Sequence, residues 1–159
     1  MLRISWNTLY SPKTALRFIV LSLICLSLST VARGCSLNIT TPVGGALVDI
    51  NDNVDGTAAD IPPGSFVWVL ARIAGISRWY PQGSGPVTLQ NGGKWTVFVT
   101  YGLPRDSGKR FEAIAAVFDG AGNTNLQQWV ATADNSGVYK PMQLPPTMCS
   151  TKPVNVTRR

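Results

Sequence analysis

The stretch SFVWVLARI, from Ser65 to Ile73, decides the fold class of this chain. It is a nearly unbroken run of β-branched, aromatic and other apolar residues, which is the pattern of a central strand buried on both faces. IPPG directly precedes it and predicts a turn, because proline fixes φ and glycine accepts a positive φ. We therefore expect a buried β-strand here, with Trp68 in the core.

Two more segments have the two-residue period of strands. Gly93–Gly102 carries Trp95, Val97, Val99 and Tyr101 on one face, and Arg110–Asp119 alternates in much the same way. With the shorter runs around them, these segments make about seven strands separated by glycine and proline turns. The sequence predicts an all-β fold, an immunoglobulin-like antiparallel sandwich of two sheets over residues 35–149.

The remaining segments give weaker signals. Residues 121–133 could hold a short helix, and residues 138–144 predict an edge strand because Pro141 cannot donate a ladder hydrogen bond. Residues 150–159 predict a polar, frayed tail.

The first 34 residues predict a signal peptide with a helical apolar segment. Arg3, Lys13 and Arg17 form a basic lead, Phe18–Ala32 is apolar, and small residues follow near Gly34. An uncleaved anchor is the alternative, although 15 apolar residues fall short of the about 20 that a transmembrane helix needs. Because a signal peptide directs export, we expect a secreted, periplasmic or cell-surface protein.

The charge and the cysteines agree with export. Four of the 14 basic residues lie in the leader and all eight acidic residues lie after it, so the net charge falls from +6 to +2. No basic stripe remains that would indicate nucleic-acid binding. Cys25 leaves with the leader, and Cys35 and Cys149 then predict a disulfide between the ends of the domain. Lipidation of Cys35 is the alternative, and would attach the protein to a membrane.

The candidate chemistry is sparse. The chain has no histidine, which excludes Ser-His-Asp and Cys-His triads, and no glycine-rich segment matches a phosphate or dinucleotide motif. No cofactor is therefore predicted. A carboxylate-based hydrolase would have to use Asp106, Glu112 or Asp119.

An oxygen-rich segment from Asp49 to Asp60 is the candidate metal site. Its potential ligands follow the spacing of a calcium loop at positions 1, 3, 5, 7 and 12; they are Asp49, Asn51, Asn53, Asp55 and Asp60. Val54 occupies position 6, where the turn requires glycine. The other interpretation is a strand followed by a polar turn.

The stretch RWYPQGSG (residues 78–85) allows two interpretations. Its residues could form a ligand platform, with aromatic faces stacking on a sugar or peptide. The ligand-binding candidates are Arg78, Trp79, Tyr80 and Gln82, with Trp129 as a further exposed aromatic. Alternatively the stretch is a structural corner at which Gln82 hydrogen-bonds backbone groups.

An ordered set of short motifs extends through the chain after Cys35. The motifs are PPG (62–64), VWV (67–69), WYPQ (79–82), GGKW (92–95), RDSGKRFE (105–112) and AAVF (115–118). In this order they resemble an uncharacterised extracellular Ig-like β-sandwich module of bacterial and archaeal proteins. The resemblance implies an accessory or binding module without a known catalytic residue set.

Together these observations predict a non-enzymatic exported module that binds a polysaccharide, a peptide or a surface protein. The alternatives are the carboxylate-based hydrolase and a calcium-stabilised adhesin domain.

Overall fold

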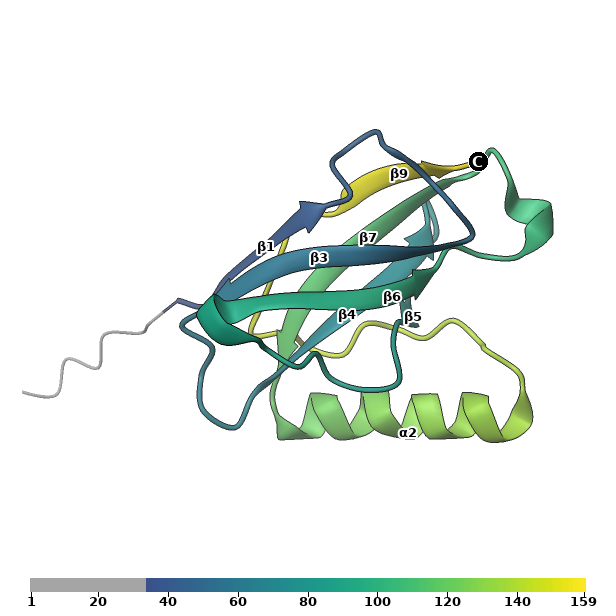
Figure 1. Cartoon of the computed structure of the whole chain (residues 1–159). Helices are drawn as coiled ribbons and strands as arrows, with labels where there is room; N and C mark the ends of the chain where they lie inside the picture. Colours follow the sequence, from purple (N-terminus) through teal and green to yellow (C-terminus); the bar gives the residue numbers. More distant parts are fainter. Residues whose placement is uncertain (1–33) are drawn as a thin grey trace, which may run out of the picture. The chain divides into compact units, whose positions relative to one another are not determined.

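The computed structural model describes residues 34–159, and the expected leader lies outside this range. The described chain is mostly β-strand with one α-helix (Figure 1). The strands are β1 (Ser36–Thr41), β2 (Leu47–Val48), β3 (Asn51–Ala59), β4 (Phe66–Ile73), β5 (Tyr80–Pro81), β6 (Lys94–Thr100), β7 (Arg110–Phe118), β8 (Cys149–Ser150) and β9 (Val154–Arg158). The helix is α2 (Gly120–Ser136), and two 3₁₀ turns are η2 (Asn91–Gly93) and η3 (Pro104–Asp106).

The smaller sheet has the order β1-β3-β6, with antiparallel pairing throughout. In β6 the residues alternate between exposed and buried, so Trp95, Val97 and Val99 face inward. Trp95 packs directly on β3 at Gly56, where an added Cβ would lie 2.1 Å from the indole Cζ2 and 2.2 Å from the Asn38 carbonyl oxygen. Residue 56 must therefore be glycine, because the large Trp95 side chain lies directly against the backbone of β3 there.

The larger sheet has the order β2-β9-β7-β4-β5, and β8 pairs with the end of β7. β4 and β7 form its centre through an eight-residue antiparallel ladder from Phe66↔Phe118 to Ile73↔Phe111. β9 pairs antiparallel with β7 and parallel with β2. The last strand thus joins two segments that are distant in sequence.

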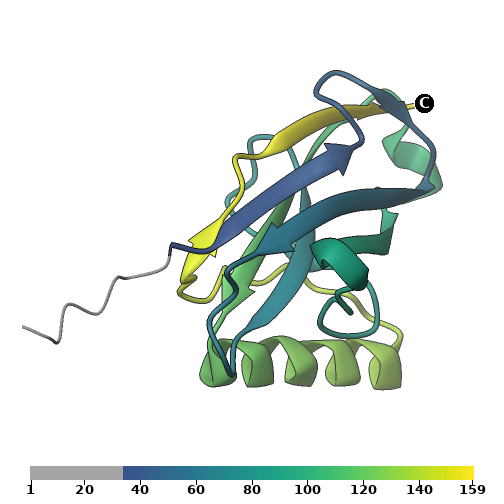
Figure 2. The same ribbon diagram turned by 60° about the vertical axis from the view of Figure 1, so that its left-hand side comes forward.

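The two sheets enclose the main hydrophobic core. Alternate residues of β4 and β7, such as Val69 and Val117, meet Val54, Trp95 and other inward side chains of the smaller sheet. The opposite face of the larger sheet is covered by α2, as Figure 2 shows from the side. Its central strands are buried on both faces for this reason.

The second core lies between the larger sheet and α2, and contains Trp68, Leu70, Trp79, Ile114, Ala116, Phe118 and Leu126. The Trp68 indole N–H donates to Asn123 Oδ1 of the helix (3.0 Å). The helix begins at Asp119, whose side chain accepts from the Gly122 N–H (2.8 Å), and ends at Gly137 with a left-handed φ of 65°. Aspartate is a favoured residue at the N-terminal cap of a helix, and glycine is favoured just after its C-terminal end.

The structure confirms the predicted strands over Ser65–Ile73, Gly93–Gly102 and Arg110–Asp119, and the burial of Trp68. The helix expected over residues 121–133 is present, and at 17 residues α2 extends beyond these bounds at both ends. Residues 138–144 were wrongly predicted as a strand: they cross the larger sheet and join it only through an isolated bridge between Met142 and Trp79. The predicted frayed tail is also wrong, because β9 forms there and Arg158 is buried.

Cys35 and Cys149 form a disulfide that joins the beginning of β1 to β8, with 114 residues between them in sequence. This confirms the predicted pairing, and the bond occupies the thiol that lipidation of Cys35 would use. Within the described range, no helix is long and apolar enough to cross a membrane.

Candidate functional site

The RWYPQGSG stretch forms a structural corner. Trp79 is only 5% exposed, and its backbone exchanges two hydrogen bonds with Met142 (2.8 and 2.9 Å). The Arg72 guanidinium lies over the indole ring at 4.1 Å. Gln82 is buried; its Nε2 donates to the Tyr80 carbonyl (3.0 Å) and its Oε1 accepts from the Thr100 N–H (2.9 Å). These contacts support the corner interpretation, because neither Trp79 nor Gln82 presents a free face.

The other two platform candidates of this stretch lie at its surface. Arg78 is exposed and Tyr80 is half-buried in the two-residue strand β5. With Trp79 turned into the second core, no pair of stacked rings remains for a ligand at this corner.

The calcium-loop hypothesis is wrong because the segment is an extended strand. β3 runs straight through the supposed loop, so Asn51 and Asp60 lie roughly 30 Å apart at about 3.3 Å per residue. The candidate ligands Asn53 and Asp55 are spread along this length. Within residues 34–159 there is no cluster of three or more His, Cys, Asp or Glu side chains that could hold a metal ion.

Side-chain oxygens of three of the five candidate ligands bind protein groups instead. Asp55 accepts from the Thr96 hydroxyl (2.7 Å) and Asn51 from that of Thr100 (2.9 Å), across the β3-β6 ladder. Asp49 forms an exposed bidentate pair with Arg159 (2.8 and 2.9 Å), and this hydrogen-bonded contact lowers the pKa of Asp49. The expected polar turn is absent too, because Asp55 and the following glycine lie inside β3.

Two of the three candidate catalytic carboxylates, Glu112 and Asp119, are separated along β7. Glu112 pairs with Arg72 (2.6 Å) opposite it on β4, and Asp119 caps α2. Because Asp119 follows the far end of β7, these two lie more than about 20 Å apart. They cannot share the cleft that paired acid and base chemistry requires.

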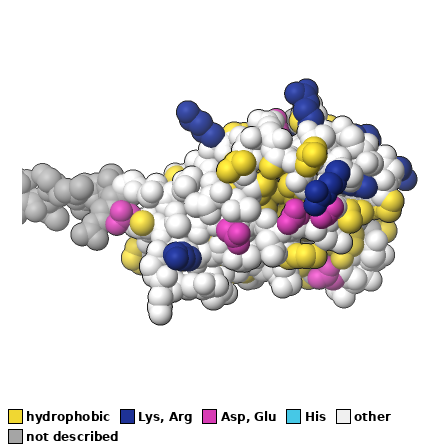
Figure 3. Space-filling model, turned by 45° about the horizontal axis from the view of Figure 1, so that its top comes forward, with side chains coloured by type: hydrophobic (Ala, Val, Ile, Leu, Met, Phe, Trp, Pro, Cys, Tyr) yellow, Lys and Arg dark blue, Asp and Glu magenta, His cyan; other side chains and the backbone are white. Residues whose placement is uncertain are grey.

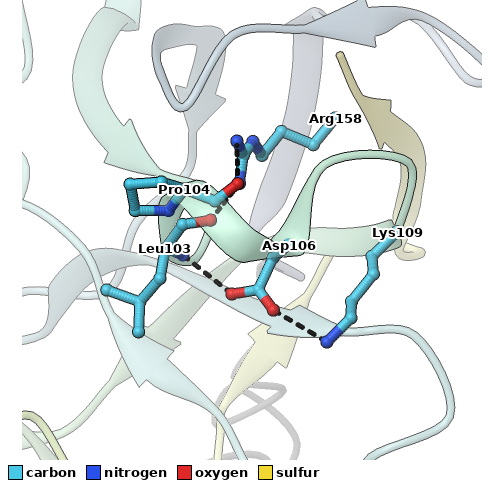
Figure 4. Close-up of polar contacts among 5 residues, drawn as sticks. All are labelled: Leu103, Pro104, Asp106, Lys109 and Arg158. Atoms are coloured by element: carbon cyan, nitrogen blue, oxygen red, sulfur yellow. Dashed lines mark hydrogen bonds and ion pairs between the residues drawn. The ribbon is translucent and has the colours of Figure 1, made fainter.

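Asp106 belongs to a polar cluster at the turn between β6 and β7 (Figure 4). Its carboxylate accepts from the Leu103 N–H (2.8 Å) and from Lys109 Nζ (2.7 Å). These hydrogen bonds, that of Lys109 first, lower the pKa of Asp106. The Arg158 guanidinium donates to the Leu103 and Pro104 carbonyl oxygens, the latter at 3.0 Å. The cluster fixes η3 against β9 and leaves the carboxylate occupied by the protein itself.

Within residues 34–159, Trp129 and Tyr139 form an aromatic pair that is exposed at the surface beside α2. Trp129 of the helix and Tyr139 of the segment after it have ring centroids 6.0 Å apart, at 59° to each other. Tyr139 is 56% exposed, Trp129 is half-buried, and the neighbouring Val138 is 54% exposed. We call Trp129, Asp134 and Tyr139 the aromatic platform.

Hydrogen bonds hold both rings of the aromatic platform in place. The Trp129 indole N–H donates to the Lys140 carbonyl (2.7 Å), and the Tyr139 hydroxyl donates to Asp134 Oδ1 (2.8 Å). The bond to Asp134 raises the pKa of Tyr139. The left-handed Gly137 reverses the chain after α2 and so returns Tyr139 to the helix. The platform is therefore preorganised before any ligand arrives.

Sequence reasoning identified Trp129 but missed Tyr139 and Asp134. A signal was present: Gly137 follows the expected helix, and a C-terminal glycine predicts a reversal of the chain. On the face in Figure 3, basic side chains lie directly beside acidic ones at one place, and the other charged side chains are scattered among neutral groups.

No family model matches the chain, and no curated protein matches it.

Proposed function

We propose that this protein is an exported, non-enzymatic module that binds a neutral polysaccharide on the aromatic platform. The observation that carries the proposal is the fixed, outward-facing Tyr139 ring beside Trp129, with a carboxylate held next to them. A peptide or a surface protein is the less favoured ligand, since the platform residues lie on α2 and the irregular segment after it, which offer no strand edge.

The chemistry of the aromatic platform suits a sugar. Sugar rings present C–H faces that pack on aromatic rings, while their hydroxyl groups require hydrogen-bond acceptors and donors. Asp134 uses Oδ1 for the tyrosine hydroxyl, which leaves its second oxygen available to a ligand hydroxyl. Because the rings are already ordered, binding avoids part of the cost of immobilising side chains.

The strand order supports the proposal that the sandwich is immunoglobulin-like. In chain order, β1, β3 and β6 correspond to the A, B and E strands of one sheet, and β4, β7 and β9 to the C, F and G strands of the other. β2 pairs in parallel with β9 as an additional strand at the G edge. α2 would then be an insertion between F and G. Trp68 differs from the usual core tryptophan of strand C, because it faces α2.

The proposed location outside the cytoplasm rests on the disulfide and the leader. Cys35–Cys149 requires an oxidising compartment to form and persist. We propose a secreted, periplasmic or cell-surface protein, as the basic and apolar leader also indicates.

Affinity electrophoresis in gels that contain neutral polysaccharides tests the proposed function. We expect retardation of the wild-type protein in at least one gel, and loss of it in Tyr139→Ala and Trp129→Ala. Tyr139→Phe keeps the ring but loses the bond to Asp134, so we expect an intermediate retardation. Leu47→Ala is the matched control, because Leu47 is 62% exposed and lies on β2. Equal retardation of wild type and Tyr139→Ala would refute the site, and binding of peptides alone would refute the ligand class.

A further inference from the structure

The two rings of the aromatic platform are tilted against each other, and this tilt limits which saccharide can cover them both. The planes of Trp129 and Tyr139 lie at 59° to each other, with ring centroids 6.0 Å apart. The indole N–H is bonded to the Lys140 carbonyl (2.7 Å) and the tyrosine hydroxyl to Asp134 (2.8 Å), so each ring is held in its orientation. The angle is therefore a property of the free protein that a ligand has to match.

The space between the two rings is too narrow for a sugar. Atoms in van der Waals contact lie about 3.5–4 Å apart, so a sugar stacked between two aromatic faces would separate them by roughly 7–8 Å. The observed 6.0 Å is instead the spacing of two aromatic rings in direct contact. A saccharide must therefore lie along the outer surfaces of the pair, with neighbouring sugar units against the two rings.

A flat saccharide surface cannot stack on both rings. Stacking places the face of a sugar parallel to the aromatic ring that it covers, and the two rings of the platform are far from parallel. In an extended ribbon chain, as in crystalline cellulose, the planes of successive sugar units stay nearly parallel, so only one ring can stack. In a chain that winds into a helix, the sugar plane turns from one unit to the next, and both rings can be covered.

The surroundings of the platform also favour a single chain over a crystal surface. Besides Tyr139, the only exposed aromatic side chain of residues 34–159 is Phe98, which belongs to the smaller sheet. Helix α2 covers the opposite face of the larger sheet (Figure 2), so Phe98 does not extend the platform into a flat row of rings. Asp134 is exposed and bonds Tyr139 through Oδ1 alone. Its second oxygen can accept from a hydroxyl group of a single chain, whereas hydroxyl groups inside a crystal are already bonded to neighbouring chains.

We propose that the ligand of the aromatic platform is a single, neutral polysaccharide chain that turns between successive sugar units, and not the flat surface of a crystalline polysaccharide. This inference rests on the proposed function and specifies its substrate class. Trp129 stacks on one sugar unit, Tyr139 stacks on a neighbouring unit, and the free oxygen of Asp134 accepts a hydrogen bond from the chain.

Affinity electrophoresis and a sedimentation assay distinguish the two kinds of ligand. Soluble starch and laminarin supply turning chains, hydroxyethyl cellulose supplies a soluble extended chain, and microcrystalline cellulose supplies a flat surface. We expect retardation in starch or laminarin gels, and no sedimentation of the protein with microcrystalline cellulose. Binding to hydroxyethyl cellulose should be roughly fivefold weaker than to the turning chain, because only one of the two rings can stack on it.

Tyr139→Phe tests whether the hydrogen bond to Asp134 fixes the tilt. The variant keeps both aromatic rings but frees the second one to turn, so the ratio of binding to turning chains over extended chains should fall toward one. Thr124→Val is the matched control, because it removes another exposed hydroxyl, which is bonded to the Gly120 carbonyl (2.9 Å) in the first turn of α2. Thr124→Val should keep the wild-type ratio.

The outcomes separate this inference from the proposed function. Sedimentation with microcrystalline cellulose that is lost in Tyr139→Ala would leave the platform as the binding site but overturn the turning chain. Equal retardation in the starch, laminarin and hydroxyethyl cellulose gels, or a wild-type ratio in Tyr139→Phe, would overturn it as well. Retardation in none of the gels, together with no sedimentation, would refute the proposed function itself and this inference with it.

Discussion

Replacement of Gly56 by alanine tests how closely the small sheet packs on its core. The added Cβ would meet Trp95 Cζ2 at 2.1 Å and the Asn38 carbonyl oxygen at 2.2 Å. Both distances are far below van der Waals contact, and the second atom belongs to the backbone of β1. The strand, as well as the indole ring, must therefore move to admit a single methyl group.

Overpacking of this kind costs about 1–3 kcal/mol, and we expect Gly56→Ala at the upper end because backbone must shift. For a domain of this size the loss corresponds to a fall in Tm of roughly 10 °C. Thermal and urea unfolding followed by circular dichroism would measure it. Gly85→Ala is the matched control, since no heavy atom lies within 4 Å of its added Cβ. A Gly56→Ala variant as stable as Gly85→Ala would refute the packing that we describe for Trp95.

Two more predictions concern the disulfide and the carboxylate of Asp106. Reduction of the Cys35–Cys149 disulfide, or Cys149→Ser, should lower the free energy of unfolding by up to about 4–5 kcal/mol, because the bond closes a loop of 114 residues; a Tm unchanged by reductant would contradict this. Lys109 and Leu103 lower the pKa of Asp106 in the folded protein. The ionised carboxylate therefore stabilises the fold at pH values above its ordinary pKa of 3.8. This stabilisation is lost as the pH falls through the lower pKa of the folded state. The difference in unfolding free energy between wild type and Asp106→Asn should therefore shrink in acid, and a difference independent of pH would show that the carboxylate is not stabilised by its charge.

The strands could be predicted from sequence where a period of two or a continuous apolar run was present. Gly93–Gly102 and Ser65–Ile73 are such segments, and both form strands where expected. β9 was missed because VNVTR is short and polar in appearance. Its strand depends on pairing with β7 and β2, which lie far away in sequence.

The helix was underestimated for a similar reason. Its first turns contain glycine and asparagine, which are poor helix formers. The cap at Asp119 and the packing of Leu126 against the larger sheet compensate for this low propensity. Tertiary contacts of this kind leave no periodic trace in one sequence.

The candidate site shows the same limit. Aromatic residue type alone did not distinguish Trp79, which is buried, from Trp129, which reaches the surface. The distinction depends on which face of the larger sheet α2 and the crossing segment cover. Likewise, the candidate calcium ligands from Asp49 to Asp60 had a plausible spacing, but that spacing requires a loop and β3 is extended.

The most direct test of the aromatic platform is the indole N–H resonance of Trp129 in a nitrogen-15 correlation spectrum. The polysaccharide that retards the protein would be titrated into it, with Trp68, Trp79 and Trp95 as buried internal controls. We predict a saturable shift of the Trp129 resonance that is absent in Tyr139→Ala, with the three buried indoles unchanged. Binding that leaves Trp129 unshifted would contradict the account.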